Sequence, residues 1–198
     1  MPKQGVKRSC VGISSSAILF ARNFFKNPTM LGSIVPSSPY LVNDLLSPVN
    51  WDRAEIVVEY GPGVGTITRE ILKRMRHDAI LVAIELNDDF VEYLGSNIRD
   101  PRLRLVHGSA GDVRRILEGL NLMHADYIIS CIPYSTIPHK LRRHIVEESC
   151  LALKAEGSML LFQFTRTVVP YLRSTFTSVR QGFQLFNILP AQIFYCTP

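Results

Sequence analysis

Long apolar runs are missing from this sequence of 198 residues, and no stretch reaches the length needed to span a bilayer. Paired cysteines and histidine ligand patterns are missing too, so we expect neither disulfides nor a metal site. The four cysteines are isolated, and we expect reduced thiols: Cys10, Cys131, Cys150 and Cys196. Internal repeats and low-complexity segments are also lacking. These absences favour one globular domain with a substantial core, in a cytoplasmic compartment.

Acidic residues are scarce at both ends of the chain. The formal net charge is +5, and residues 1–50 hold five basic residues against Asp44 alone. From Phe162 onward there are three arginines and no acid. Basic ends indicate an anionic partner, either nucleic acid or a lipid surface. The alternative is a solvated basic face that only improves solubility. A cleaved signal peptide is not expected, because Arg22 interrupts the short apolar stretch near the N-terminus.

A glycine-rich loop, residues 59–65 (EYGPGVG), follows the β-branched run Ile56-Val57-Val58. The run is short and apolar, which is typical of a buried parallel strand. Glycines at alternate positions let the backbone turn tightly and approach a ligand closely. A helix is predicted from Thr66 to about Arg74, and its positive end would point at that ligand. The loop therefore predicts a site for a nucleotide-like cofactor.

A second apolar run, residues 81–84, ends at Glu85, 24 positions after Gly61. A carboxylate at the end of a strand is placed to accept hydrogen bonds from two ribose hydroxyls. The loop spacing is G-x-G-x-G rather than the dinucleotide fingerprint G-x-G-x-x-G. With Glu59 two positions before the first glycine, it resembles motif I of the class I S-adenosylmethionine-dependent methyltransferases. We therefore predict S-adenosyl-L-methionine as cofactor and S-adenosyl-L-homocysteine as product.

Strands and helices are predicted to alternate along the rest of the chain. The further strands fall at 102–106, 127–129 and 158–162, and the helices at 66–76, 88–98, 111–119 and 138–154. Two closing apolar runs, 183–188 and 192–195, predict an antiparallel hairpin. Such alternation predicts an α/β fold whose parallel sheet is covered on both faces. As in class I methyltransferases, we expect a Rossmann-like, seven-stranded, mostly parallel sheet over residues 49–198. A helical, membrane-binding lid segment is expected over residues 1–48.

Residues 107–110 (HGSA) follow the third predicted strand. Many class I methyltransferases carry an aspartate at the position of Ser109, where it accepts from the adenine amino group. A contact through Ser109 and Ala110 would be weaker or made by the backbone. An ordinary turn capped by Ser109 or Asp112 explains these residues equally well.

Residues 130–134 (SCIPY) follow the fourth predicted strand, where the methyl acceptor meets the sulfonium in these enzymes. Enzymes that methylate adenine N6 carry Asn-Leu-Pro-Tyr or Asn/Asp-Pro-Pro-Tyr there. The amide or carboxylate accepts from the exocyclic amine, and the ring stacks on the flipped base. This chain keeps Pro133 and Tyr134 but has Ser130 and Cys131 before them, which disfavours adenine chemistry. Tyr134 either lines a pocket for a cationic nitrogen or packs in the core.

An amphipathic pattern lies near the N-terminus. At the helical period Phe20, Phe24 and Phe25 share one face, and Arg22 and Lys26 lie opposite. Phenylalanines backed by basic residues are typical of a helix lying in a membrane interface. The alternative is a helix packed on the domain's own core, and periodicity does not separate the two.

Several segments together resemble the bacterial phospholipid N-methyltransferase family. The resemblance covers about residues 20–195, in the segments 24–28, 32–38, 59–65, 108–110, 133–138, 163–165 and 187–191 and at Glu85. The Pro-Ser-Ser and Asn-x-x-Pro-Ala segments are more particular to that family than motif I. These enzymes are also similar in sequence to rRNA adenine dimethyltransferases.

The resemblance implies methyl transfer from S-adenosyl-L-methionine to the amine of phosphatidylethanolamine and its methylated derivatives, toward phosphatidylcholine. The enzyme would bind peripherally to an anionic membrane surface at the inner face of the cell membrane, and nucleic acid is not expected as a partner. One alternative is an rRNA or other nucleic-acid adenine N6 methyltransferase. The other is a membrane-binding protein that keeps the cofactor fold without activity.

The resemblance also implies roles for individual residues. Cofactor contacts are expected from Glu59, Gly61, Pro62, Gly63, Gly65, Thr66, Glu85, Leu86, Ser109, Ala110 and Ser130. Candidates for the catalytic or acceptor site are Ser130, Tyr134, Tyr40 and His139, and no general base stands out among them. Contacts with lipid or membrane are expected from Ser37, Ser38, Ile132, Pro133 and the predicted N-terminal helix.

Overall fold

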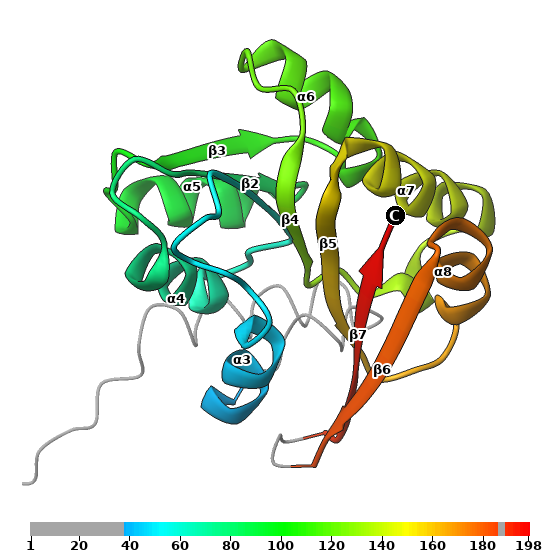
Figure 1. Ribbon diagram of the computed structural model, residues 1–198. Coiled ribbons are helices and arrows are strands. Elements are labelled where there is room, and N and C mark those ends of the chain that lie inside the picture. The colour runs from blue at the N-terminus through cyan, green and yellow to red at the C-terminus, as the bar shows by residue number, and fades with distance from the viewer. Residues whose placement is uncertain (1–37, 186–188) are drawn as a thin grey trace, which may run out of the picture.

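The computed structural model of the chain describes residues 38–185 and 189–198 (Figure 1). The predicted amphipathic helix lies outside the described residues, and so does Ser37. Their roles at a membrane stay predictions.

Seven strands form one sheet in the order β3-β2-β1-β4-β5-β7-β6. In chain order they are β1 (Ile56–Tyr60), β2 (Ile80–Glu85), β3 (Leu103–His107), β4 (Ala125–Ser130), β5 (Leu153–Gln163), β6 (Ser178–Gln184) and β7 (Ala191–Thr197). Neighbours from β3 through β5 pair in parallel, whereas β7 pairs antiparallel with both β5 and β6. The predicted Rossmann-like α/β sheet with a closing antiparallel hairpin is confirmed.

Helices cover both faces of the sheet (Figure 1). On one face α3 (Pro39–Leu46) and α4 (Thr66–Arg74) share an apolar cluster with strand residues such as Val57, and α5 (Asp88–Asn97) packs on β2 and β3. On the other face α6 (Val113–Gly119), α7 (His139–Ala152) and α8 (Val169–Thr175) pack in a cluster that includes Val58. Two short 3-10 helices are η2 (Ala110–Asp112) and η3 (Tyr134–Thr136). Because successive strand residues face opposite layers, the central strands are apolar on both sides.

Helix α3 belongs to the same core as the sheet. The Ser38 hydroxyl caps it by accepting from the Leu41 amide at 3.2 Å, and Pro39 occupies the first turn. The helix buries Leu41 and Leu45 completely, and the Tyr195 hydroxyl of β7 donates to its Asp44 carbonyl at 3.1 Å. Residues 39–46 are thus anchored to the sheet, while the division of the chain at residue 48 stays a prediction.

Three elements of the C-terminal half differ from the sequence prediction: β5, β6 and a helix, α8. Strand β6 begins at Ser178 rather than at residue 183, and β5 begins at Leu153 rather than at residue 158. Both added segments carry exposed polar residues, because β6 is an edge strand and the start of β5 reaches the rim of the sheet. An apolar run does not mark such segments. Helix α8, with seven residues, is too short for a periodic signal and was not predicted.

Candidate active site

Three glycines shape the loop that follows β1. Gly61, Gly63 and Gly65 have φ angles of +65°, +57° and +80°, in the left-handed region that glycine tolerates best. A Cβ atom at Gly61 would lie 2.8 Å from the Ile132 Cγ2 atom, so this glycine also permits the loops after β1 and β4 to approach each other. A Cβ atom at Gly63 would meet no atom within 4 Å. Gly63 therefore borders open space in which a ligand can approach the backbone.

The contact between the loops after β1 and β4 marks the switch point of the sheet. From β1 the chain order runs to β2 and β3 on one side, and β4 and β5 lie on the other. Connections leave the two central strands toward opposite faces, which opens a crevice at their carboxyl ends. The glycine loop, Glu85 and Ile132 all lie at this edge.

The Glu85 carboxylate is 7% exposed and is held by backbone amides. Its Oε2 atom accepts from the Gly63 amide at 3.0 Å, and its Oε1 atom accepts from the Leu86 and Asn87 amides at 2.9 and 3.0 Å. A carboxylate has about four acceptor positions, so about one remains on Oε2 for a ribose hydroxyl. Burial raises the pKa of Glu85, although the three amides and His107 oppose that rise.

The Glu59 carboxyl group is fully buried beside the loop. Neither of its oxygens, nor the Thr68 hydroxyl, has a hydrogen-bond partner among the described residues. Burial raises the pKa of Glu59 to about 8; the nearby Thr68 hydroxyl and amide oppose the rise, and the Glu85 charge adds to it. Glu59 is therefore protonated at neutral pH and has one O–H group to donate.

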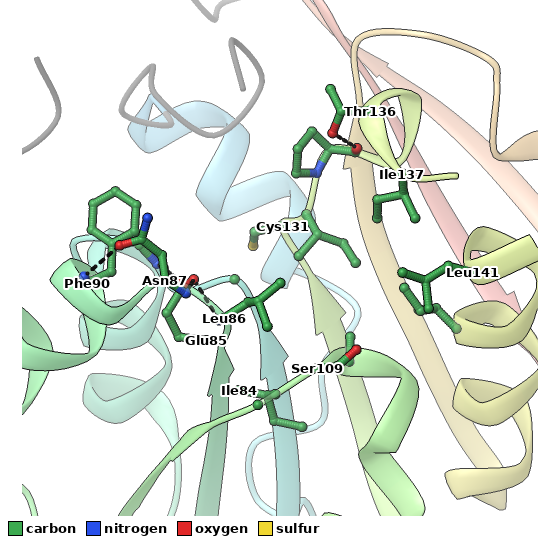
Figure 2. A pocket seen from close by; sticks show the side chains of 17 residues that line it. Ile84, Glu85, Leu86, Asn87, Phe90, Ser109, Cys131, Thr136, Ile137 and Leu141 are labelled. Atoms are coloured by element: carbon green, nitrogen blue, oxygen red, sulfur yellow. Dashed lines mark hydrogen bonds between the residues drawn. The ribbon is translucent and has the colours of Figure 1, made fainter. Parts of the chain in front are cut away.

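A pocket with an empty volume of about 800 Å³, including space open to solvent, lies at these strand ends. Its walls come from segments 61–63, 84–90, 108–110, 131–137 and 141–145. Figure 2 shows Leu86 and Cys131 on the side of the central strands and Ile137 and Leu141 on the side of α7. Most lining side chains are apolar, and the polar ones are Glu85, Asn87, Ser109, Cys131 and Thr136.

Six of the eleven predicted cofactor residues line this pocket, together with two residues predicted to contact lipid. Those that line it are Gly61, Gly63, Glu85, Leu86, Ser109, Ala110, Ile132 and Pro133. Those that do not line it are Glu59, Pro62, Gly65, Thr66 and Ser130. Gly65 has a packing role instead, since a Cβ atom there would lie within 2.8 Å of side-chain atoms of Leu94 and Ile98. The role of each residue toward the cofactor stays a prediction.

The Ser109 side chain lines the pocket and also caps a short helix. Its hydroxyl accepts from the Gly111 amide at 3.2 Å, which caps η2. Asp112 makes no capping hydrogen bond and instead pairs with Arg115 at 3.1 Å. The predicted capped turn is thus present, with Ser109 rather than Asp112 as the cap.

The segment after β4 turns Tyr134 away from the pocket. The Tyr134 ring is fully buried in the core on the α7 side, and the Ser130 hydroxyl donates to its hydroxyl at 3.5 Å. The Gln163 side chain holds the segment in place: its Oε1 atom accepts from the Tyr134 amide at 3.2 Å and its Nε2 atom donates to the Ile132 carbonyl at 2.9 Å. In this geometry the packing alternative describes Tyr134, and Cys131, Ile132 and Pro133 face the pocket instead.

The other catalytic candidates lie apart from the pocket lining. Tyr40, on α3, is 62% exposed. His139 is exposed at the start of α7, where its ring meets the Tyr171 ring edge-on at 5.3 Å between centroids. Ser38 caps α3. Neither the two catalytic candidates nor Ser38, which was predicted to contact lipid, lines the pocket.

Several lining residues were not predicted from sequence. They come from the start of α5 and from η3 and α7: Asn87, Phe90, Thr136, Ile137, Leu141 and Ile145. Gln163, the clamp on the acceptor segment, was also missed as a site residue. Its position as a polar residue at the carboxyl end of a buried strand was an available signal. The apolar residues of α7 carried no signal of their own, because core residues of a helix have the same pattern.

The residues present fit S-adenosyl-L-methionine. Glu85 keeps an acceptor position at the ribose edge, Gly63 leaves open space, and the walls at Leu86, Ile132 and Leu141 are apolar enough for an adenine ring. No group of three or more potential metal ligands occurs within residues 38–185 and 189–198.

Sheet order, glycine loop and pocket define a class I S-adenosylmethionine-dependent methyltransferase. The family model described as ribosomal RNA adenine dimethylase matches residues 15–179. The chain belongs to this family.

Solved structures of other proteins share this fold. An O-methyltransferase from Bacillus cereus in complex with S-adenosylhomocysteine has a TM-score of 0.69 at 13% identity, over 96% of this chain and 94% of that one. A TehB-like methyltransferase from Corynebacterium glutamicum has a TM-score of 0.62 at 13% identity, over 92% and 98%.

Two kinds of relative match the sequence. An ornithine lipid N-methyltransferase from Singulisphaera acidiphila is 28% identical over 180 residues, which is 90% of this chain and 94% of that protein. Ribosomal RNA small subunit methyltransferase A from Clostridium perfringens is 35% identical over 68 residues, which is 34% of this chain and 23% of that protein. The match to the lipid enzyme covers nearly its whole length. The match to the Clostridium rRNA enzyme covers less than a quarter of that protein, and a ribosomal RNA small subunit methyltransferase A from Dehalococcoides mccartyi is 31% identical over 67% of this chain and 43% of that protein.

Proposed function

We propose that this chain transfers methyl groups from S-adenosyl-L-methionine to the primary amine of a membrane aminolipid, and that it binds the membrane peripherally. Phosphatidylethanolamine, methylated toward phosphatidylcholine, is the acceptor that the sequence favours. The similarity to an ornithine lipid N-methyltransferase supports an aminolipid and adds ornithine lipid as a second head group to test. No helix within residues 38–185 and 189–198 is long and apolar enough to cross a membrane.

The observation that carries the proposal is the acceptor end of the pocket. Cys131, Ile132 and Pro133 line it, and the preceding Ser130 is buried and directed to Tyr134. No amide or carboxylate side chain stands in this segment to accept from an adenine amine. The amine of a membrane lipid does not need this amide or carboxylate acceptor, because the membrane holds the acyl chains and the head group of the lipid.

The pocket walls suit an amine nucleophile. The amine must be neutral to attack, because an ammonium has no lone pair to donate. Apolar walls at Ile132, Ile137 and Leu141 disfavour the charged form and lower the pKa of an amine held there. The bound cofactor supplies the activated methyl group. The residues of the chain orient the amine and exclude water around it.

Cys131 is the one thiol in the pocket lining and does not compete with the amine. Burial raises the pKa of Cys131 well above its usual range, and at the alkaline pH where a thiol titrates the ionised Glu59 and Glu85 carboxylates raise it further. The thiolate is the nucleophilic form of cysteine, so a protonated Cys131 is inert toward the methyl donor.

The test is methyl transfer from labelled S-adenosyl-L-methionine with three acceptors offered separately to the purified full-length chain. These are vesicles containing phosphatidylethanolamine, vesicles containing ornithine lipid, and a small-subunit rRNA transcript. Label in the organic phase from the first vesicles is expected. If only the vesicles containing ornithine lipid yield label, the acceptor is still an aminolipid, but ornithine lipid replaces phosphatidylethanolamine as the proposed substrate.

The family match favours adenine N6 methylation of rRNA as the second candidate. Efficient labelling of the transcript with no labelled lipid would establish that candidate and reject the lipid acceptor. No label with any acceptor, together with measurable binding of S-adenosyl-L-homocysteine, would favour a cofactor-binding protein without activity.

A further inference from the structure

The first residues of α7 concentrate positive charge where a helix tolerates it least. Residues 139–144 read HKLRRH, and the first turn contains no acidic residue. Cations near a helix N-terminus face the positive end of the helix dipole and are unfavourable there. Lys140 and Arg143 are exposed, and neither forms an ion pair among the described residues. The helix itself therefore offers no stabilising reason for them.

Many cations elsewhere on the described surface are neutralised. The paired ones include Lys73 with Glu70, Arg76 with Asp78, Arg102 with Asp100, Arg114 with Glu148 and Lys154 with Asp126. From Phe162 onward the chain has no acid at all, and Arg166 and Arg173 around α8 are exposed without an ion pair in the described part of the chain. Cations without an ion pair thus occur on α7 and on the segment that carries α8, and among the described residues they also occur at Arg53, Arg99 and Arg180.

The Tyr171 ring of α8 contacts basic side chains from the start of α7. The guanidinium carbons of Arg142 and Arg143 lie 5.5 and 6.0 Å from its centroid, and the His139 ring meets its edge. Contact with an aromatic face offsets part of the repulsion between the two arginines. Arg142 has a structural task as well, since it donates to the Tyr134 and Ile137 carbonyls at 2.9 and 2.8 Å.

The same end of α7 forms a wall of the pocket. Ile137, Leu141 and Ile145 line the pocket, and Leu141 is 40% exposed at its mouth. Figure 2 shows Ile137 and Leu141 directed into the pocket from this side. Lys140 and Arg143 are neighbours of Leu141 on the first turns of the helix. An apolar wall of the pocket and cations without an ion pair therefore belong to one helix.

We propose that this basic face, composed of His139, Lys140 and Arg143 at the start of α7, docks on the phosphate groups of an anionic lipid surface. This proposal rests on the proposed lipid acceptor. It identifies the face of the protein that would contact the membrane in which that lipid lies. Phosphates of the bilayer would neutralise the unpaired cations, and the pocket mouth beside Leu141 would open toward the head groups. The acceptor amine would then enter the pocket without the lipid leaving the bilayer.

The test uses the full-length chain and the double substitution K140E/R143E, with Arg142 left intact because it holds the pocket segment. The matched control is R53E/R99E, which changes the net charge equally. Arg53 and Arg99 are exposed and precede β1 and β3, so they lie at the opposite edge of the sheet. Flotation with vesicles of phosphatidylglycerol and phosphatidylcholine measures binding, and vesicles of phosphatidylcholine alone report the dependence on charge. Affinity for S-adenosyl-L-homocysteine confirms the fold of each variant.

Wild type is expected to bind the anionic vesicles, and K140E/R143E to bind them at least about tenfold more weakly, because each Lys or Arg near an anionic surface contributes to binding. The control is expected within about twofold of wild type. If K140E/R143E loses affinity for S-adenosyl-L-homocysteine, K140Q/R143Q takes its place, with a smaller loss of vesicle binding expected.

The proposal would be overturned if the wild type did not bind the vesicles. It would also be overturned if K140E/R143E bound as well as the wild type, or if K140E/R143E and R53E/R99E lost binding equally. Loss of binding to an rRNA hairpin, with vesicle binding retained, would assign the face to nucleic acid and overturn it as well. Vesicle binding is measured without methyl transfer. Selective loss in the α7 variant therefore supports docking even if the wild type methylates no lipid, which would reject the proposed acceptor alone.

Discussion

The Glu85 carboxylate accepts from the Gly63 amide at 3.0 Å, and this bond joins two loops that are 22 residues apart in the chain. Parallel pairing of β1 with β2 places Tyr60 opposite Ile84, so the next residues, Gly61 and Glu85, leave the sheet side by side. The Gly61 amide also donates to the Ile84 carbonyl at 2.9 Å. Two hydrogen bonds therefore join the glycine loop to the carboxyl end of β2.

Replacing Glu85 by Ala should weaken binding of S-adenosyl-L-homocysteine at least about tenfold, because a hydrogen bond to a charged group contributes about 1.5–3 kcal/mol. The substitution also releases the three amides that the carboxylate holds. Isothermal titration calorimetry measures the affinity. Asp88→Asn is the matched control, since the Asp88 side chain is 89% exposed. Equal affinities of E85A and wild type would contradict the role of Glu85.

The glycines of the loop should respond differently to substitution by Ala. Each substitution strains a left-handed residue by about 1–2 kcal/mol. Gly61→Ala adds the collision with Ile132, so its free energy of unfolding should fall more than that of Gly63→Ala. Gly63→Ala projects a methyl group into open space at the pocket and should mainly weaken cofactor binding. Urea unfolding with and without S-adenosyl-L-homocysteine compares them, and the reverse order of stability would count against this geometry.

Stability should fall as pH rises toward 8 because of Glu59. The folded state keeps Glu59 protonated up to a pKa of about 8, whereas the unfolded chain loses that proton near 4.5. Between these values the folded state binds more protons, so its stability declines by up to about 1.4 kcal/mol per pH unit. Glu59→Gln removes the titrating group and should gain stability relative to wild type from pH 5 to pH 8. A constant difference between the two unfolding free energies over this range would refute a buried, protonated Glu59.

Tyr134→Phe separates packing from acceptor contact. If the ring only packs, the variant loses a weak hydrogen bond to Ser130, about 1 kcal/mol of stability, and keeps its turnover. Tyr134→Ala should cost about 3–5 kcal/mol, because it empties a buried aromatic position. Chemical unfolding and kcat are measured together. A hundredfold loss of kcat in Y134F at unchanged stability would show that Tyr134 acts at the acceptor site.

Gln163→Ala should loosen the acceptor segment. The Gln163 side chain joins the Tyr134 amide to the Ile132 carbonyl, and its loss leaves the buried amide and the partly buried carbonyl without this partner. We expect a fall in kcat of about tenfold or more with little change in affinity for S-adenosyl-L-homocysteine. Gln181→Ala is the control, since Gln181 is exposed and bonds only across the edge hairpin to Gln192. Similar kinetics for Q163A and Q181A would show that the clamp has no catalytic consequence.

The central part of the fold was predictable because its signals are local. Val57 and Val58 face opposite layers, so β1 begins with the continuous apolar run 56–58, and a glycine loop follows the strand directly. Strand β6 was predicted five residues too late, because an edge strand with one exposed face carries no such run. Helix α8 escaped prediction for lack of length.

The sequence by itself determined the sheet, the glycine loop with Glu85, and hence the cofactor, since backbone conformation and strand pattern depend on neighbouring residues. Only the tertiary structure decided what surrounds the acceptor. In the folded chain Tyr134 is buried in the core, and Gln163 forms hydrogen bonds with the segment after β4. Leu141 lines the pocket on the same helix as cations that have no ion pair among the described residues. These outcomes depend on how α7 and β5 pack against β4, and contacts between residues so far apart in the chain leave no mark in local composition.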